Sequence, residues 1–592
     1  MKTALTKKRR YMSGIDGLRA LAVIGVILYH LNYEWLPGGF LGVTIFFVLS
    51  GYLITDLLFE EWNQKGKIDI IDFWFRRARR LLPAFLFFMF ILTVWILFFH
   101  PEAVGKLQAD FLPSILYIIN WWYIFKDISY FETFGMPSPF THLWSLAVEE
   151  QFYLFWPLLF FFILIIFKKN SLRVLVIFLF IFLSAFLMAD IYTPGEDPSR
   201  VYYGTDTRSY SLLIGSVLAI FWPSQKLSKT LPALPRLCLE IAGLLGLVMI
   251  IIMFYFSNQY DNFLYQGGMV LLSIYTALLI ACLAHPATFL GKLFSLSPLR
   301  WIGTRSYAIY LWHYPIIILT TPNLYSGEID RVLIFLQLTA TFIIAEISYR
   351  LIETPFRKGV YQQWLKPRLN PKIYQRGAVF IGVLVFYLFM SGTTYAIISK
   401  VEHEPVSVSG TYHSLKHTNL IAKTIPDAQK MKNIQQEQKS ITIIGDSIIY
   451  DVIPHFKKVY PSAIIDYSVG RQMADVPEVI NKLRANGQLG NHIVLEIGTN
   501  GPFPDAKLHE VLDMLHNAEK IYLVNTRVPR PWQNIVNETL QKVASERENV
   551  VLVDWYQASK NQPSYFTADG VHLTIEGGKA YAELLVAHIQ RQ

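Results

Sequence analysis

Long apolar runs fill the first four hundred residues of the chain, and no run of comparable length follows them. A helix needs about 20 predominantly apolar residues to cross the hydrocarbon core of a bilayer. Candidate spans are centred near residues 26, 50, 90, 156, 182, 216, 247, 275, 314, 341 and 388. Those near 216 and 314 are the weakest, because they are short and carry polar groups. The pattern predicts a multi-pass α-helical membrane domain of about 11 transmembrane helices.

Composition divides the chain at the same place. Hydrophobic residues make up 53% of the 592 residues and charged residues only 16%, whereas about a quarter is charged in typical soluble domains. Residues 401–592 nevertheless have an ordinary soluble composition, so at least two domains are expected. We predict four parts: a membrane domain of ten spans (1–376), an eleventh span (377–399), a polar linker (400–439) and a soluble domain (440–592).

Lysine and arginine gather in alternate loops between the predicted spans. The rich loops are 7–10, 65–80, 168–173, 226–236, 292–305 and 350–376. The loop 257–263 has neither residue type. Because cytoplasmic loops carry the excess of positive charge, the N-terminus is predicted to be cytoplasmic, and eleven crossings place residues after 400 outside the cell. The net charge of +9 follows from these loops and does not indicate a nucleic-acid partner.

Two further patterns exclude simple alternatives. The apolar segment 111–125 holds Trp121, Trp122 and Tyr123, which favour the headgroup region, so we expect an interfacial segment rather than a twelfth span. Both cysteines, Cys238 and Cys282, lie in apolar segments. The soluble domain therefore has no disulfide and no cysteine metal site. Its histidines lack ligand partners at useful spacing, and no metal is expected.

Ionisable residues inside the predicted spans are candidates for function, because a charge in the hydrocarbon core is costly. Arg19 and His30 flank the first span, and at 1.5 Å per residue His30 lies roughly 16 Å deeper than Arg19. Glu149 and Glu150 stand together near the start of another span, so at least one should meet a cation or a water-filled cavity. The alternatives are a hydrogen-bonded packing histidine and a structural ion pair. Two less informative residues are interpreted as structural: Glu346 and His313.

Two polar clusters adjoin the spans. The run "RRARR" provides four arginines, which are either positive-inside charge or a clamp for an anionic cytosolic donor such as the phosphates of coenzyme A. These are Arg76, Arg77, Arg79 and Arg80. The run "RVYYGTDTR" (200–208) lies outside or at the outer interface in the predicted topology. Its Tyr202 and Tyr203 are either interfacial anchors or positions where a group is held near the exit.

Several motifs of the membrane half resemble the membrane acyltransferase-3 family. They are "GIDGLRALAVIGVILYH", "FFVLSGYLI", "RRARRLLPA" and "LWSLAVEEQFY", in the expected order over roughly residues 10–355. The spacing of Arg19 and His30 matches that family's Arg-x10-His pattern. The resemblance implies that both residues are essential, that cytosolic acetyl-CoA is the acyl donor without being a tightly bound cofactor, and that the acyl group crosses the bilayer.

In the soluble domain apolar runs alternate with helical patterns. Strands are predicted at 441–445, 463–468, 492–497, 520–525 and 550–554. Helices are predicted near 449–459, 472–486, 505–518, 533–547 and 574–589. This alternation predicts a three-layer α/β domain with a parallel, flavodoxin-like sheet. The loops at the carboxyl ends of the strands should then carry the site.

Four pieces of an acyl-transfer site fall in such loops. Ser447 follows the first predicted strand, Gly470 the second and Asn500 the third. Asp569 and His572 stand three apart before the last helix, so that the carboxylate can orient the imidazole and the imidazole can take the serine proton. Backbone N–H groups of Ser447 and Gly470 and the Asn500 amide are predicted to form an oxyanion hole.

These blocks resemble the SGNH/GDSL hydrolase family over about residues 440–592, although Gly501 stands where that family's third block has Asp. The whole chain resembles the peptidoglycan O-acetyltransferases of Gram-positive bacteria. The resemblance implies acetyl transfer through an acetyl-serine to the C6 hydroxyl of N-acetylmuramic acid at the cell surface, which confers lysozyme resistance.

Three alternatives remain open on the sequence. One changes the acceptor to a teichoic acid or another exopolysaccharide. Another is a membrane-tethered carbohydrate esterase in which residues 1–400 only anchor or regulate. The last is a transporter with an extracellular binding module.

Overall fold

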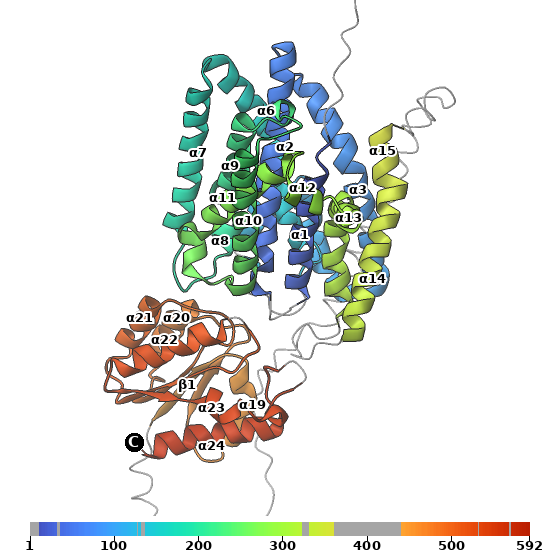
Figure 1. Ribbon diagram of the computed structural model, residues 1–592. Helices are drawn as coiled ribbons and strands as arrows, with labels where there is room; N and C mark the ends of the chain where they lie inside the picture. Colours follow the sequence, from blue (N-terminus) through green and yellow to red (C-terminus); the bar gives the residue numbers. More distant parts are fainter. Residues whose placement is uncertain are drawn as a thin grey trace, which may run out of the picture. The chain divides into compact units, whose positions relative to one another are not determined.

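The computed structural model describes residues 11–31, 36–126, 128–131, 137–321, 331–359, 440–530, 532–567 and 570–591. The chain forms two compact units that divide near residue 393 (Figure 1). The predicted eleventh span (377–399) and the predicted linker (400–439) lie outside the described residues.

Helices build the whole described part of the first unit. A long helix stands at each predicted span centre up to residue 341. These helices are α1 (Ser13–His30), α2 (Gly42–Lys65), α3 (Ile70–Phe99), α6 (Trp144–Ile166), α7 (Asn170–Ile191), α9 (Thr205–Phe221), α10 (Ala233–Phe256), α11 (Met269–Ala284), α13 (Ser297–Thr320) and α14 (Arg331–Ser348). Short helices connect them: α4 (Val104–Ile115), α5 (Ile119–Phe125), α8 (Ser199–Tyr203), α12 (Phe289–Leu293) and α15 (Thr354–Lys358).

Length and hydropathy make this unit a membrane domain. Among the described residues, 8 helical stretches are long and apolar enough to cross a bilayer. The helices α9 and α13 are not among them, and they correspond to the two spans that the sequence marked as weakest. The number of crossings therefore stays a prediction. Residues 111–125 do not form one spanning helix, because the chain breaks between α4 and α5, where Tyr117 takes a φ of 53°.

The innermost helices approach one another at glycines. Gly51 of α2 faces the backbone of Leu212 in α9, and Gly303 of α13 faces the backbone of Asp16 in α1. A methyl group at either glycine would overlap the facing carbonyl oxygen. Small residues of this kind allow membrane helices to pack at backbone distance. Large apolar side chains of α7 and α10 instead remain exposed, as expected for faces that meet lipid.

The second unit is a five-stranded parallel sheet in the order β2-β1-β3-β4-β5. Its strands are β1 (Ile441–Gly445), β2 (Ile464–Tyr467), β3 (His492–Glu496), β4 (Lys520–Val524) and β5 (Val550–Val553). Each coincides with a predicted strand to within one residue at either end, and the order is that of flavodoxin-like sheets. The α/β prediction is confirmed.

Helices cover both faces of this sheet (Figure 1). On one side lie α20 (Val476–Ala485), α21 (Asp505–Met514) and α22 (Gln533–Ser545), and on the other α19 (Ile448–Phe456) and α24 (Ile575–Arg591). The core between the sheet and α24 is apolar, with Ile443, Val494 and Tyr522 packed against Leu585 and Ile589. A short helix that the sequence did not predict, α23 (Trp555–Ser559), follows β5.

Candidate active sites

The turn between β1 and α19 presents the predicted nucleophile of the second unit. Ser447 immediately precedes α19, and its Oγ lies 3.1 Å from Nε2 of His572. The Asp446 side chain fixes the turn, since its Oδ1 accepts a hydrogen bond from the Ile448 N–H at 3.0 Å. The serine and the histidine, 125 residues apart, are thus close enough for proton transfer from the hydroxyl to the imidazole.

The predicted oxyanion-hole residues meet at the same edge of the sheet. Gly470 has a φ of 76°, a conformation that favours glycine, in the turn after β2. Arg471 follows Gly470, and its backbone carbonyl accepts a hydrogen bond from the Asn500 side-chain amide at 3.3 Å. The side-chain amide of Gln472 donates to the backbone carbonyl of Asn500 at 2.7 Å. The loops after β1, β2 and β3 therefore converge at the switch point of the sheet, where ligands bind in open α/β folds.

The loop that carries His572 is held by contacts that the sequence reasoning missed. Asp451 of α19 accepts a hydrogen bond from the Leu573 N–H at 3.1 Å. Arg527 donates to the Gly570 carbonyl at 3.0 Å. Neither residue belongs to a motif block of the sequence. Asp569 lies outside the described residues, so its orienting role stays a prediction.

Two buried carboxyl groups lie behind the nucleophile. The Asp446 N–H donates to Glu496 Oε2 at 3.0 Å, and the exposed fractions of the two residues are 0% and 4%. Burial raises the pKa of Asp446 to about 6. Burial and the neighbouring charge of Asp446 raise the pKa of Glu496 well above its usual range. The sequence reasoning assigned no role to either acid.

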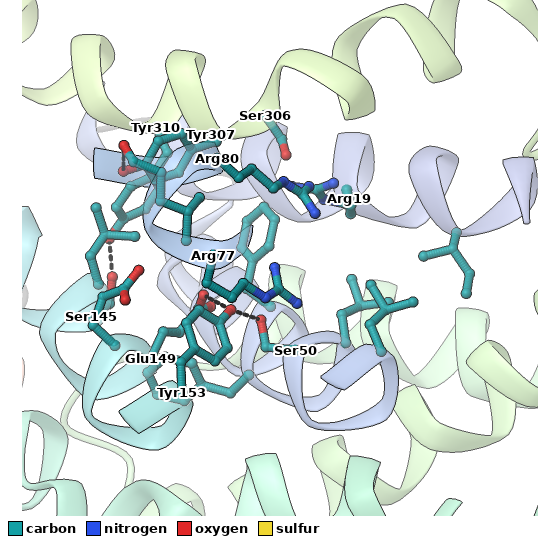
Figure 2. A pocket seen from close by; sticks show the side chains of 18 of the residues that line it. Arg19, Ser50, Arg77, Arg80, Ser145, Glu149, Tyr153, Ser306, Tyr307 and Tyr310 are labelled. Carbon is teal, nitrogen blue, oxygen red and sulfur yellow. Dashed lines mark hydrogen bonds between the residues drawn. The ribbon is translucent and has the colours of Figure 1, made fainter. Parts of the chain in front are cut away.

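A cavity of about 470 Å³ opens among the helices of the membrane domain. Its polar lining joins charged residues from three predicted sites: Arg19, Arg76, Arg77, Arg80, Glu149 and Glu150. Arg19, Arg77, Arg80 and Glu149 are labelled in Figure 2. Arg79 is not part of the lining. The cavity therefore brings three of the four "RRARR" arginines together with the acidic pair and with Arg19, and cationic groups line most of its charged wall.

One wall of the cavity is a hydrogen-bonded cluster around Glu149 (Figure 2). The Tyr153 hydroxyl lies 2.7 Å from Glu149 Oε2 and 2.9 Å from Ser50 Oγ. The Arg77 guanidinium lies over the Tyr153 ring, 4.9 Å from its centroid. This arrangement meets the expectation that an acid placed in a span needs a cation or a cavity beside it.

Tyr310 connects the cavity to a group of histidines. Its side chain lines the cavity, and its hydroxyl lies 2.6 Å from Ser145 Oγ and donates to the His142 carbonyl at 2.9 Å. Its backbone carbonyl accepts a hydrogen bond from His313 Nδ1 at 2.7 Å. Tyr310 therefore contacts both the cavity and the imidazole of His313.

The hydrogen-bond partners assign the tautomers of these imidazoles. Since a carbonyl can only accept, His313 Nδ1 carries a proton and its Nε2 is free to accept. His30 Nδ1 lies 3.0 Å from that nitrogen and must donate. His30 Nε2 is then the acceptor for the Tyr130 hydroxyl, 2.8 Å away. Neutral His30 is thus oriented as a base toward Tyr130, and His313 orients it.

Tyr130 is a candidate site residue of this half that the sequence reasoning missed. It lies in a short loop segment without periodicity, and only its place beside His30 reveals it. The predicted candidates Tyr202 and Tyr203 are fully buried on α8, with ring centroids 5.2 and 5.8 Å from that of Tyr130. They pack around Tyr130, while the hydrogen bond to His30 belongs to Tyr130.

The described ranges contain no cluster of metal-ligating side chains. No group of three or more His, Cys, Asp or Glu residues there is placed to hold an ion. The predicted absence of a metal site remains a prediction for the residues outside those ranges.

Together, a helical membrane domain with a Tyr–His couple and an α/β domain with a Ser–His couple define an acyl-transferring membrane enzyme. The model of the acyltransferase domain family matches residues 12–350. The chain belongs to this acyltransferase family.

Curated relatives match along the whole chain. The peptidoglycan O-acetyltransferase OatA of Listeria monocytogenes is 42% identical, with 99% of each chain covered. The O-acetyltransferase OatA of Staphylococcus aureus is 40% identical, with 98% of this chain and 96% of that protein covered. These matches identify the chain as an O-acyltransferase.

Among solved structures, the C-terminal catalytic domain of the Streptococcus pneumoniae peptidoglycan O-acetyltransferase A, with a methylsulfonyl adduct, matches at 22% identity and a TM-score of 0.23. It covers 26% of this chain and 93% of that chain.

Proposed function

We propose that the chain O-acetylates peptidoglycan at the cell surface, on the C6 hydroxyl of N-acetylmuramic acid, and so confers lysozyme resistance. The membrane domain takes the acetyl group from cytosolic acetyl-CoA, and the C-terminal domain, outside the cell, transfers it to the glycan. The observation that supports this most is the presence of two base-activated hydroxyls in one chain, Tyr130–His30 and Ser447–His572. The whole-chain similarity to peptidoglycan O-acetyltransferases supports the acceptor.

The cavity suits the donor. Arg19, Arg76, Arg77 and Arg80 supply guanidinium forks for the phosphates of coenzyme A, which bind such forks bidentately. In the proposed topology these arginines face the cytoplasm. The pantetheine arm then extends toward Tyr310 and the histidines at the inner end.

His30 promotes the first transfer. His30 Nε2 accepts the proton of the Tyr130 hydroxyl, the phenolic oxygen attacks the thioester carbonyl, and the coenzyme A thiolate leaves with the proton from His30. Coenzyme A is released as the free thiol and Tyr130 becomes an acetyl ester.

Ser447 carries the second transfer. His572 takes the serine proton, Ser447 Oγ attacks the acetyl carbonyl of the donor ester, and the alcohol of that ester leaves with the proton from His572. His572 then deprotonates the sugar hydroxyl, which attacks the acetyl-serine, and the Ser447 hydroxyl is restored with that proton. The tetrahedral oxyanion of each step lies at the backbone N–H groups of Ser447 and Gly470 and the Asn500 amide. One such donor contributes roughly 3 kcal/mol to lowering the barrier.

The deciding experiment uses the full chain in detergent micelles with isotopically labelled acetyl-CoA and a soluble muropeptide acceptor. Mass spectrometry measures acetylated sugar and free acetate. We expect acetylated sugar from the wild type and none from Ser447→Ala, and we expect His30→Gln to abolish transfer from acetyl-CoA. Acetate alone at every acceptor concentration would instead identify an esterase.

A muramic-acid-free glycan chain serves as the acceptor control. Equal acetylation of that chain would move the acceptor to another surface glycan and leave the two-step chemistry in place.

A further inference from the structure

Behind Ser447, two carboxyl groups face each other without a cation. Asp446 follows β1 and Glu496 ends β3, and these strands are neighbours in the sheet. The two residues are buried, and the Asp446 N–H donates to Glu496 Oε2 at 3.0 Å. No lysine or arginine of the described segments pairs with either carboxyl. Arg471 is bound to Asp466 and to the carbonyl of Gly445, the residue before Asp446.

Three of the four carboxyl oxygens have donors. Asp446 Oδ1 accepts from Ile448 N–H at 3.0 Å, and Glu496 Oε1 accepts from the Thr499 hydroxyl at 3.3 Å. Asp446 Oδ2 is buried and, within the described part of the chain, has no donor. A buried carboxylate oxygen without a donor is costly. A proton on Glu496 would supply that donor.

One ionisable group of another element, His572, acts on Asp446, and its effect on the pKa of Asp446 is opposite to that of burial and smaller. From α24 the buried Tyr581 ring lies near both acids and carries no positive charge. Thr526 after β4 contacts Thr499 at 3.3 Å. Two carboxyl groups buried side by side are costly to ionise together, so one proton is retained between them.

We propose that Asp446 and Glu496 share one proton, and that the resulting carboxyl–carboxylate hydrogen bond locks the Ser447 turn to the Asn500 loop. Glu496 is therefore a positioning residue for acyl transfer. This assignment rests on the proposed function, in which Ser447 is the nucleophile that accepts the acetyl group.

The geometry explains why this bond affects catalysis. Asp446 is adjacent to Ser447 and caps the turn that aims its Oγ, while Glu496 holds Thr499, which is adjacent to Asn500. The bond thus joins the nucleophile to an oxyanion donor across two strands. When rising pH removes the shared proton, two anions repel and the two loops separate.

The test compares two substitutions of Glu496 in the purified full chain. Glu496→Gln retains a donor for Asp446 Oδ2 without an ionisable proton, whereas Glu496→Leu removes it. The matched control is Glu583→Gln, an exposed acid of α24 that is paired only with Lys579 at 3.8 Å. An activated aryl acetate delivers the acetyl group directly to Ser447, and the released aryl alcohol gives the acylation rate from pH 5 to pH 10.

We expect Glu496→Gln to acylate within about threefold of the wild type at pH 6, and to lose the alkaline decline that the wild type shows. Glu496→Leu is expected to be slower by roughly 10- to 100-fold, because displacement by about 1 Å has such effects. Equal loss in the Gln and Leu variants, or the same alkaline decline in wild type and Glu496→Gln, would overturn the proposal.

A spectroscopic measurement keeps the test decisive if Glu496→Leu does not fold. The infrared difference spectrum of wild type minus Glu496→Gln at neutral pH should contain the C=O stretch of a protonated carboxyl. Its absence would also overturn the proposal. Acylation that persists in Ser447→Ala would refute the proposed function itself, which is a different outcome from equal rates in the two Glu496 variants.

Discussion

The substitution His313→Phe tests the assignment of His30 as the base of the membrane domain. The change removes Nε2, the atom that accepts the hydrogen bond from His30 Nδ1 at 3.0 Å, and keeps a planar ring in the buried position. His30 Nδ1–H then keeps the Val26 carbonyl as an acceptor, so one contact holds this tautomer in place of two. In the other tautomer Nε2 carries the proton and cannot accept one from Tyr130.

The structure sets the magnitude of this effect. The loss of one hydrogen bond costs about 0.5–1.5 kcal/mol, and each 1.36 kcal/mol in a barrier changes a rate tenfold. We therefore expect the rate of coenzyme A release from acetyl-CoA to fall by roughly 2- to 13-fold. His313→Gln should recover most of the rate, because its Oε1 can accept the same hydrogen bond.

The assay follows coenzyme A release by the full chain in detergent micelles, with mass spectrometry of the thiol. His100→Gln is the control, since His100 caps the far end of α3 and pairs with Glu102. Acylation of Ser447 by an aryl acetate reports the integrity of the other unit and should not change. A rate for His313→Phe equal to that of the wild type would refute the tautomer assignment.

Further predictions concern both units. His572→Gln removes the base that lies 3.1 Å from Ser447 Oγ and should lower aryl acetate turnover by at least about 10²-fold, measured as burst and steady-state release of the aryl alcohol. Gly303→Ala places a methyl group against the Asp16 carbonyl and should separate α1 from α13 beside the cavity. We expect a higher KM for acetyl-CoA and a lower Tm. The control Gly105→Ala adds its methyl group in open space and should leave KM and Tm unchanged. Because the folded pKa of Asp446 is raised from 3.8 to about 6, its stabilising contribution is present below pH 4 and is lost as pH rises through 6, which amounts to ~3 kcal/mol. Hydrogen exchange of β1 and β3 peptides, corrected for the intrinsic rate, should show this loss of protection, and protection that rises over the same range would contradict it.

The sequence predicted the architecture of both units because apolar length and apolar alternation decide it. The central strands β1, β3 and β4 are short buried runs followed by turns, and burial on both faces leaves few other solutions. The motif residues Ser447, Gly470, Asn500 and His572 could be placed for the same reason, since parallel strands bring their carboxyl ends to one edge. Each of these predictions needed only local pattern and one topological rule.

The residues that escaped prediction depend on contacts across the fold. Tyr130 acquires its role from His30, 100 residues away, and His313, which was interpreted as structural, lies 283 residues from His30. No local pattern encodes such pairs. Glu496 resembled the polar end of a strand, and only the register of β1 against β3 places it at Asp446.

The arginine run shows a limit of the sequence argument. At 100° per residue, Arg76, Arg77 and Arg80 share a 100° arc of a helix, but Arg76, Arg79 and Arg80 share an equally narrow one. The cavity is lined by the first set and not by Arg79. Helical phase alone does not choose between the two sets, and only the packing of α3 against its neighbours decides.

In the proposed route the two hydroxyls also set the direction of transfer. A phenol has a pKa near 10, so an acetyl-tyrosine has a far better leaving group than the ester of an aliphatic alcohol. The acetyl group passes from the activated phenyl ester of Tyr130 to the alkyl ester of Ser447 and then to the alkyl ester of the sugar. Transfer back from Ser447 to Tyr130 is therefore disfavoured. The surroundings match this order, because Tyr130 packs among the buried rings of Trp144, Tyr202 and Tyr203, which limit the access of water to the more reactive ester.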